Sequence, residues 1–532
     1  MQAESDYGKE TLSALYGKRN SEREHYLNRA RRASELTIPG LYPKRGTTGA
    51  TLLKEPWQSL GARGINGLAA KIVQAIFPEN VPFFKKSVDE LARKTLAATA
   101  AEQEEIDAGL AQYERVLTER LQSSNLRAKL NDCAKQLIVG GNALLHVVDE
   151  ANFRVFKLSD YVVERDPVGN VLTIVVKEKI SRRALPPELH EASDDKDTES
   201  DATAVVDVYT GIFLEEEKER YCIYQEVLGK EVPGSRGHYP LDRMPWLALR
   251  FYVVDGEHYG RGYVDEYIGD LAALEGLSKA IVQGAAASSK LVWLVKPGSV
   301  TNKAALKRAL NGDFVDGDVQ DVQALQVQKQ SDFGVAQQQI RDISERLGMA
   351  FLLNSSIQRT GERVTAEEIR YMAQSLENEL GGIYSLLSQE LQLPLVKAVE
   401  FQMQRKKLLP MLPKNVIRTT ITTGVEALGR GQDVDRLRMF VMDLVQLGPQ
   451  AMQSLNIDNL ISRLAVARGI NVDGLVKSAA QLQQEQMAAQ QAQQEQMMQQ
   501  QMMQSTGAIA EKAIPEMIAG AGEGAMLPPE PQ

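Results

Sequence analysis

The chain has 532 residues, of which 43% are hydrophobic and 25% are charged, an ordinary globular composition with enough length for several packed regions. Its formal net charge of -9 argues against a broad basic surface that would hold duplex DNA by counterion release. Two widely separated cysteines, Cys133 and Cys222, exclude a disulfide framework and favour a reducing compartment such as the cytoplasm. The sequence predicts neither a secretory signal nor a membrane span, because no run of about 18 apolar residues occurs.

The N-terminal quarter of the chain predicts a layer of helices. Apolar residues recur every three or four positions in three segments, which is the spacing of an amphipathic helix. Pro39 with Gly40, and then Pro78, end the first two segments. The three segments are residues 5–35, Trp57–Phe77 and Ala101–Val139.

The apolar spacing then changes from helical to alternating, which predicts a small antiparallel sheet. Polar turns are expected at Asp166–Asn170 and Glu215–Glu219. The acidic stretch Glu191–Ala202 lacks large apolar residues and is expected to form a solvated, mobile loop. The expected strands are Ala143–Val148, Phe153–Leu158, Tyr161–Glu164, Val171–Lys177, Val205–Leu214, Tyr221–Leu228 and Trp246–Val254.

Two predicted helices of similar length flank a compact, β-rich module. At 1.5 Å per residue, Val264–Ser288 would extend roughly 37 Å and Ser331–Ala350 roughly 30 Å. A module this small buries little surface alone, so we expect the two helices or neighbouring copies to complete it. Its expected elements are the strands Leu291–Val295, Phe314–Val315 and Val322–Val327 and the short helix Lys303–Leu310.

A long helix is predicted to begin at Thr365, which forms a T-x-x-E capping box with Glu368. Apolar residues then repeat every three or four positions as far as Val399. Bends are expected at Gly381-Gly382 and at Pro394, because glycine pairs and proline weaken a helix.

The C-terminal part of the chain predicts one strand and then further helices. Val416–Thr423 is rich in β-branched residues and is expected to pair with a sheet elsewhere. Helices are expected at Val434–Leu447 and Ile457–Ala467. The Gln/Met-rich tract Gln481–Gln504 fits low-complexity filler, a coiled-coil seam or a surface for partner helices, and its weak apolar stripe favours a helix end that frays unless packed. Residues 506–532 are expected to be disordered.

Catalytic and metal-binding motifs are missing from the sequence. Without GxxxxGK[ST] we expect no P-loop ATPase, and without HExxH, an EF-hand loop or Cys/His ligand spacing we expect no metal and no cofactor. Cys133 and His146 lie in apolar runs that predict core residues, and the carboxylates Glu215–Glu217 and Asp194-Asp195 are expected to be solvated. The glycines of Gly256–Gly262 favour turn geometry over a phosphate loop. We therefore expect no catalytic residue and no enzyme activity.

A cluster of polar and basic residues lies where the helical spacing is lost and then resumes. It comprises Gln358, Arg359, Arg363 and Arg370. Such a loop would contact DNA phosphates if it faced a pore. The same residues would equally form salt bridges between subunits, and charge alone does not decide between these interpretations.

Five segments, in order along nearly the whole chain, resemble one family. They are LTIPGLYP (36–43), WQSLGARGINGLAAKI (57–72), GEHYGRGYVDEYIGDL (256–271), RTGERVTAEEIRYMAQSLENELGGIYSLLSQELQLPLV (359–396) and EALGRGQDVDRL (426–437). The family is that of the portal, or head-to-tail connector, proteins of short-tailed, podovirus-type phages that encode their own RNA polymerase. The resemblance fades in the Gln-rich tract after Gln481.

The resemblance implies an α+β, mainly helical portal fold with a wing, a helical stem, a clip and a helical crown, assembled as a ring of twelve. The implied regions are a wing of N-terminal helices and antiparallel sheet (1–262), the first stem helix (263–289), the clip (290–330), the second stem helix (331–350), the tunnel loop (351–364), the wing helix and returning strand (365–432), the crown (433–505) and a disordered tail (506–532).

The implied function is a channel at one capsid vertex for genome packaging and ejection, in a virion assembled in the host cytoplasm. Implied partners are other copies of the chain, capsid and scaffolding proteins, the terminase large subunit, a tail adaptor, internal core proteins at the crown, and double-stranded DNA that passes without sequence specificity.

Two groups of residues are implied as sites by the same resemblance. Gln358, Arg359 and Arg363 of the tunnel loop are expected to contact DNA in the channel. The clip is expected to dock the terminase and then the tail adaptor through Lys296, Lys303, Lys307 and Arg308. The alternatives are another virion component, such as an internal core or tail-tube protein, and a DNA-processing enzyme, for which the sequence offers no metal ligands or P-loop.

Overall fold

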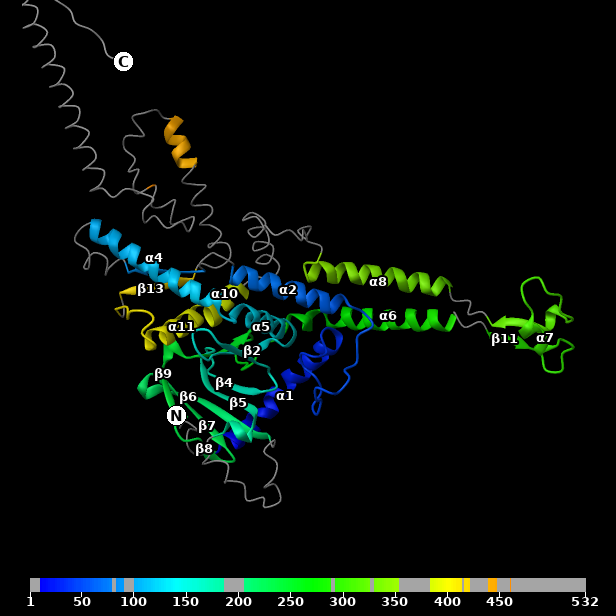
Figure 1. Ribbon diagram of the computed structural model, residues 1–532, viewed down its shortest axis with the longest axis horizontal. Coiled ribbons are helices and arrows are strands. Elements are labelled where there is room, and N and C mark those ends of the chain that lie inside the picture. The colour runs from blue at the N-terminus through cyan, green and yellow to red at the C-terminus, as the bar shows by residue number, and fades with distance from the viewer. Residues whose placement is uncertain are drawn as a thin grey trace, which may run out of the picture. The chain divides into compact units, whose positions relative to one another are not determined.

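The protein is described by a computed structural model, shown in Figure 1. The structure describes residues 10–78, 83–89, 100–185, 205–288, 292–325, 330–353, 383–413, 416–421, 439–446 and 460. The chain divides into two units, residues 1–430 and 431–532, and in the second the described residues are the helix 439–446 and residue 460. Helices and antiparallel sheets make up the first unit, as the α+β expectation requires.

Helices form the N-terminal part of the fold, as predicted. They are α1 (Leu12–Leu36), α2 (Leu60–Ile76), α4 (Ala100–Ser123) and α5 (Leu126–Gly140). The prediction of one continuous helix from Ala101 to Val139 was wrong, because the chain breaks between α4 and α5 at Asn125. Asn125 donates its backbone N–H to Ala151 O, and its side-chain Oδ1 accepts from Phe153 N at 2.9 Å. The helix is interrupted here because Asn125 forms hydrogen bonds with the backbone of Ala151 and Phe153.

Two antiparallel sheets follow where the alternating pattern predicted strands. The first has the order β10 (Trp246–Arg250), β2 (Asn142–Val147) and β3 (Phe153–Phe156). The second runs β4 (Tyr161–Arg165), β5 (Val171–Ser181), β6 (Val205–Glu215), β7 (Arg220–Val227) and β8 (Lys230–Glu231), and β9 (Gly237–Pro240) also pairs with β7. The acidic loop Glu191–Ala202 lies outside the described residues.

The second sheet is apolar on both faces. Ile174, Ile212 and Ile223 lie opposite one another in β5, β6 and β7 and belong to the main core. Residues of the opposite parity, such as Phe213 and Tyr224, form a second cluster with Leu12 at the start of α1. Because side chains alternate between faces along a strand, the near-continuous apolar runs are what a sheet covered on both sides requires.

A separate two-stranded sheet joins distant parts of the chain. In it β1 (Phe84–Val88) pairs with β13 (Ile417–Ile421), the returning strand that the sequence predicted without a partner. The Lys86 side chain, only 3% exposed, contacts Glu400 Oε1 at 2.8 Å, and the Tyr113 hydroxyl donates to the same oxygen. Lys86 lies on β1, Tyr113 on α4 and Glu400 on α11 (Leu393–Arg405), so a buried ionic contact fixes this corner of the fold.

The helix expected to bend at Pro394 does change its winding there. After α10 (Ile383–Leu387) the chain forms a π-helical turn, η7 (Ser388–Gln392), and α11 then begins with Pro394 near its start. Glu390 in this turn accepts hydrogen bonds from the Arg250 backbone N and side chain, at 3.0 Å from Nε. The expected helix start at Thr365 and the bend at Gly381-Gly382 lie outside the described residues.

Candidate functional site

The two predicted long helices form an antiparallel hairpin. They are α6 (Ile268–Ser288) and α8 (Gln330–Ala350), which lie side by side in Figure 1. Arg346 Nη2 lies 3.0 Å from Asp270 Oδ1 toward one end. Toward the other end, a Cβ added to Gly284 would lie 2.5 Å from a Phe333 ring carbon, so glycine permits the close approach of the helices.

The first turn of the hairpin differs from the prediction of one helix from Val264. Residues Tyr263–Tyr267 form a 3₁₀ turn, and α6 begins at Ile268. The backbone at Gly262 passes so close to α5 that an added Cβ would lie 2.6 Å from Val139 O. The Asp265 carboxylate accepts a hydrogen bond from Gly262 N, which tightens the turn at this contact.

The two halves of the hairpin differ in burial. Near the main core, Leu271 and Leu274 of α6 and Ile343 and Leu347 of α8 are buried. In the half that leads to the module, Val282 is 50% exposed and Val335 is 66% exposed. The chain carries no charge from Ala280 to Ser288 or from Phe333 to Ile340. An uncharged helix surface with exposed valines is typical of a region that packs against another protein.

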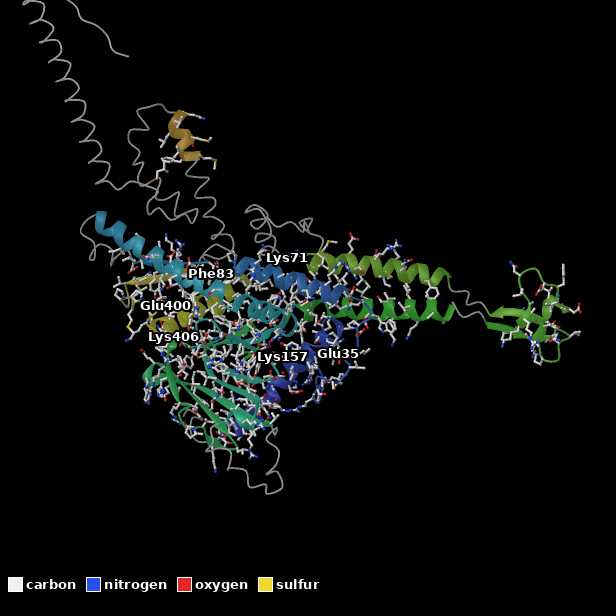
Figure 2. The ribbon with its side chains drawn as sticks, in the orientation of Figure 1. Glu35, Lys71, Phe83, Lys157, Glu400 and Lys406 are labelled. Carbon is white, nitrogen blue, oxygen red and sulfur yellow. The ribbon has the colours of Figure 1, made fainter. Side chains whose placement is uncertain are left out.

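The end of α8 is held firmly at the core. Phe351 is buried and packs against the rings of Tyr263 and Tyr267, at centroid distances of 6.0 and 5.9 Å. Leu352 has a φ of +55°, an uncommon conformation for a residue with a side chain. Its carbonyl oxygen accepts a hydrogen bond from Lys71 Nζ at 2.5 Å, and burial lowers the pKa of this lysine (Figure 2). These contacts fix where the chain leaves the hairpin.

The module between the helices consists of β11 (Val292–Val295), α7 (Lys303–Arg308) and β12 (Val322–Leu325). The two strands pair antiparallel, as predicted. The predicted strand at Phe314–Val315 was wrong, because these residues are irregular. The loop around them bonds to nearby side chains instead of a strand: Leu310 N donates to Asp313 Oδ2 at 2.7 Å.

The module buries polar groups and exposes apolar ones. Among its described side chains the buried ones are Thr301 and Asp321, whose Oγ1 and Oδ2 atoms lie 3.3 Å apart. Its exposed large apolar residues are Leu294, Val300, Leu306, Leu310, Phe314 and Val319. The Phe314 side chain is fully exposed. Since these six side chains are exposed in the single chain, we expect them to be covered by another molecule.

Charge is divided within the module. The predicted docking residues Lys296, Lys303, Lys307 and Arg308 are all exposed, and the last three lie on α7. Lys303 and Lys307 are four residues apart and therefore share one face of this helix. Four aspartates, Asp313, Asp316, Asp318 and Asp321, balance the charge on the following loop. The module is thus basic in α7 and acidic in the loop that follows it.

The predicted DNA-contact residues Gln358, Arg359 and Arg363 lie outside the described residues, as does Arg370. The prediction of a core residue is confirmed for Cys133, whereas His146 is only partly buried. Cys133 is buried, and burial raises the pKa of its thiol to about 12. His146 stacks on Trp246 with ring centroids 3.6 Å apart, and burial lowers the pKa of its imidazole to about 3.

A family model for the bacteriophage head to tail connecting protein matches residues 9–476. The chain belongs to this family. The chain is 41% identical to the portal protein of Enterobacteria phage T3 over 519 residues, and this match covers 97% of both chains. It is also 41% identical to the portal protein of Escherichia phage T7, again over 97% of both chains. The portal protein of Pseudomonas phage phiKMV is 31% identical over 86% of this chain and 90% of its own length.

As a head-to-tail connector, the chain is a component of the phage virion at the vertex where head and tail join. This confirms the resemblance and the function that the sequence suggested. None of the helices in the described part of the connector is both long and apolar enough to cross a membrane.

Proposed function

We propose that this connector assembles as a ring of twelve copies around a channel for double-stranded DNA. The module of residues 292–325 is the single observation that carries the proposal, because among its described side chains six large apolar ones are exposed and the two buried ones are polar. In a ring, each copy would present these exposed apolar side chains to the next, which would cover them.

A rotational ring with more than two members places one side of each copy against a different side of its neighbour. The exposed apolar residues of the module would then meet a different surface of the next copy, while the cations of α7 would face other partner proteins. The uncharged half of the α6–α8 hairpin would pack against neighbouring hairpins in the same way. We assign α6 and α8 to the stem, residues 290–330 to the clip and residues 433–505 to the crown.

A channel that moves DNA in both directions must not bind it strongly. Twelve copies at a net charge of -9 carry about a hundred negative charges, which repel phosphates and let the duplex slide. In the tunnel loop, Gln358, Arg359 and Arg363 would make brief contacts that do not depend on sequence and that resist backsliding. If phage carrying neutral residues at both arginines package and retain as much DNA as wild type, this role is wrong and salt bridges between subunits become the better assignment.

The clip would dock the terminase large subunit during packaging and a tail adaptor afterwards. The exposed cations Lys296, Lys303, Lys307 and Arg308 suit acidic surfaces on these partners. Wing and stem surfaces would meet capsid and scaffolding proteins, and the crown would meet internal core proteins. The role is structural and not enzymatic, in keeping with relatives that are named portal proteins.

Electron microscopy and native mass spectrometry of the purified full-length chain test the ring. We expect a flanged ring with a central hole and a mass twelve times the 58.8 kDa of one chain. A stable monomer, even beside scaffolding and capsid proteins, would contradict the proposal. An internal core or tail-tube protein would give a particle without the flange.

A further inference from the structure

Three strands of the second sheet bring a carboxylate, a thiol and an imidazole together. Cys222 on β7 lies opposite His238 on β9 and opposite Phe213 on β6. Glu215 is two residues beyond Phe213 and therefore points to the same face of the sheet as Phe213. One ligand atom from each of Glu215, Cys222 and His238 lies within 4.8 Å of the others.

We propose that Glu215, Cys222 and His238 bind a divalent transition-metal ion of the zinc class. Thiolate sulfur, imidazole nitrogen and carboxylate oxygen are the ligands that zinc takes in proteins, at about 2.0–2.3 Å. Tetrahedral geometry at these bond lengths places ligand atoms about 3.3–3.8 Å apart. Since the ligand atoms lie within 4.8 Å of one another, the side chains need to close by no more than about 1.5 Å, and His238 is exposed enough to rotate.

The neighbouring charges prepare the carboxylate for this role. Arg220 Nε lies 2.7 Å and Lys218 Nζ lies 3.5 Å from Glu215, and both contact Oε2. The hydrogen bond from Arg220 Nε fixes the position of the Glu215 carboxylate. The ion would bind Oε1 of Glu215. Arg220 would stay hydrogen-bonded to Oε2 and hold the carboxylate in its orientation.

Three protein ligands leave the fourth tetrahedral position to water, which is typical of an exchangeable site and not of a closed structural one. The ion would tie β9 to β6 and β7. From β9 the chain passes through the 3₁₀ turn Leu241–Arg243 into β10 of the first sheet. Metal binding would therefore fasten the connection between the two sheets and stabilise the folded state by linkage.

The inference departs from the expectation of no metal site, which rested on sequence spacing. Neither the interval from Glu215 to Cys222 nor that from Cys222 to His238 matches a metal-ligand motif. Only the antiparallel register of three strands brings the residues together. The signal was thus not in any local motif but in which residues pair across the sheet.

Titration of the purified full-length protein with Co²⁺ tests the site, since thiolate-bound cobalt absorbs in the near ultraviolet. We expect one Co²⁺ per chain with a thiolate band that excess Zn²⁺ removes. Cys222→Ser should abolish the band, and His238→Ala should weaken Co²⁺ binding by at least about tenfold, the size of loss that even outer-shell changes cause. Because His238 is exposed, its variant remains informative if Cys222→Ser does not fold.

Matched controls separate this site from adventitious binding. Cys133→Ser removes the other buried cysteine, and His25→Ala removes an exposed histidine on α1. Both variants should keep the wild-type band and affinity. The proposal is overturned if wild type shows no thiolate band, if His238→Ala binds Co²⁺ as tightly as wild type, or if Cys133→Ser loses the band.

Discussion

The sheet of β4 to β9 and the module of residues 292–325 differ in how far they bury their apolar side chains. The sheet is covered on both faces, by the main core on one side and by the start of α1 on the other. The module buries Thr301 and Asp321 among its described side chains and exposes Phe314. Apolar burial is the main driving force of folding, and the first region achieves it within one chain, whereas the described large apolar side chains of the second are exposed. We therefore expect the sheet to stabilise the subunit and the module to act in contacts with other molecules.

The largest expected effect on folding is at the junction of hairpin and core. Phe351→Ala should lower the free energy of unfolding by about 3–5 kcal/mol, because the ring is fully buried against Tyr263, Tyr267 and Gly64. Denaturant unfolding of the unassembled chain measures it. The matched control is Phe314→Ala in the module, which removes an exposed ring of the same size. Equal losses in the two variants would refute the contrast between the regions.

The buried carboxylate of Glu150 should make a smaller contribution to stability, which is lost at low pH. Burial raises the pKa of Glu150, but hydrogen bonds from Lys406 and Arg120 outweigh it and hold the pKa below its usual value (Figure 2). The carboxylate therefore stabilises the fold above the unfolded-state pKa of about 4.3, and this stability is lost as pH falls through the folded-state pKa.

Glu150→Gln should accordingly flatten the acid side of the stability profile, measured as melting temperature between about pH 3 and 6. Glu119→Gln, a change at an exposed residue of α4, serves as the control and should leave the profile unchanged. If the melting temperature of Glu150→Gln falls with pH as steeply as that of wild type, the ion pairs of Glu150 do not stabilise the fold.

Phe314→Ser should change the free energy of unfolding by no more than about 0.5 kcal/mol, as exposed substitutions usually do. It should nevertheless reduce the fraction of chains in rings, because the side chain is expected to pack on a neighbouring copy. Sedimentation or native mass measurement gives that fraction. Rings that form as readily as in wild type would show that the exposed ring faces solvent or a different partner.

The smallest effect on folding is expected for Lys303→Glu combined with Lys307→Glu, since both side chains are exposed on α7. Rings made of this variant should bind the terminase more weakly, most clearly at low salt, because charge contacts at a rim act mainly on association. Lys230→Glu on β8 is the control. If the double variant binds the terminase normally, these lysines are not the docking surface.

Periodicity predicted most elements of the fold but not their breaks or pairings. The helices of the hairpin and the strands β2 to β7 follow from apolar spacing, because burial dictates both the sequence pattern and the structure. The break at Asn125 depends on a hydrogen bond to Phe153, and the irregular path at Phe314 depends on local aspartates. Both involve contacts that no local pattern records.

Some candidate site residues could be named from the sequence, and others depend on contacts between distant segments. The family resemblance suggested the cations of α7 as docking residues, and this stays a prediction. The pairing of β1 with β13 was not predicted, because the two strands lie at opposite ends of the first unit. Glu215, Cys222 and His238 were missed for the same reason. A short segment with a distant partner carries too little information by itself.

The pairing of β1 with β13 also sets an order of events during translation. Phe84 leaves the ribosome long before Ile421, its partner, has been synthesised. At about 5–20 residues per second the delay is roughly 20–70 s, during which Lys86 lacks both Glu400 and Thr419. The hairpin and the module, which lie between these strands in the chain, are therefore synthesised before this corner can close.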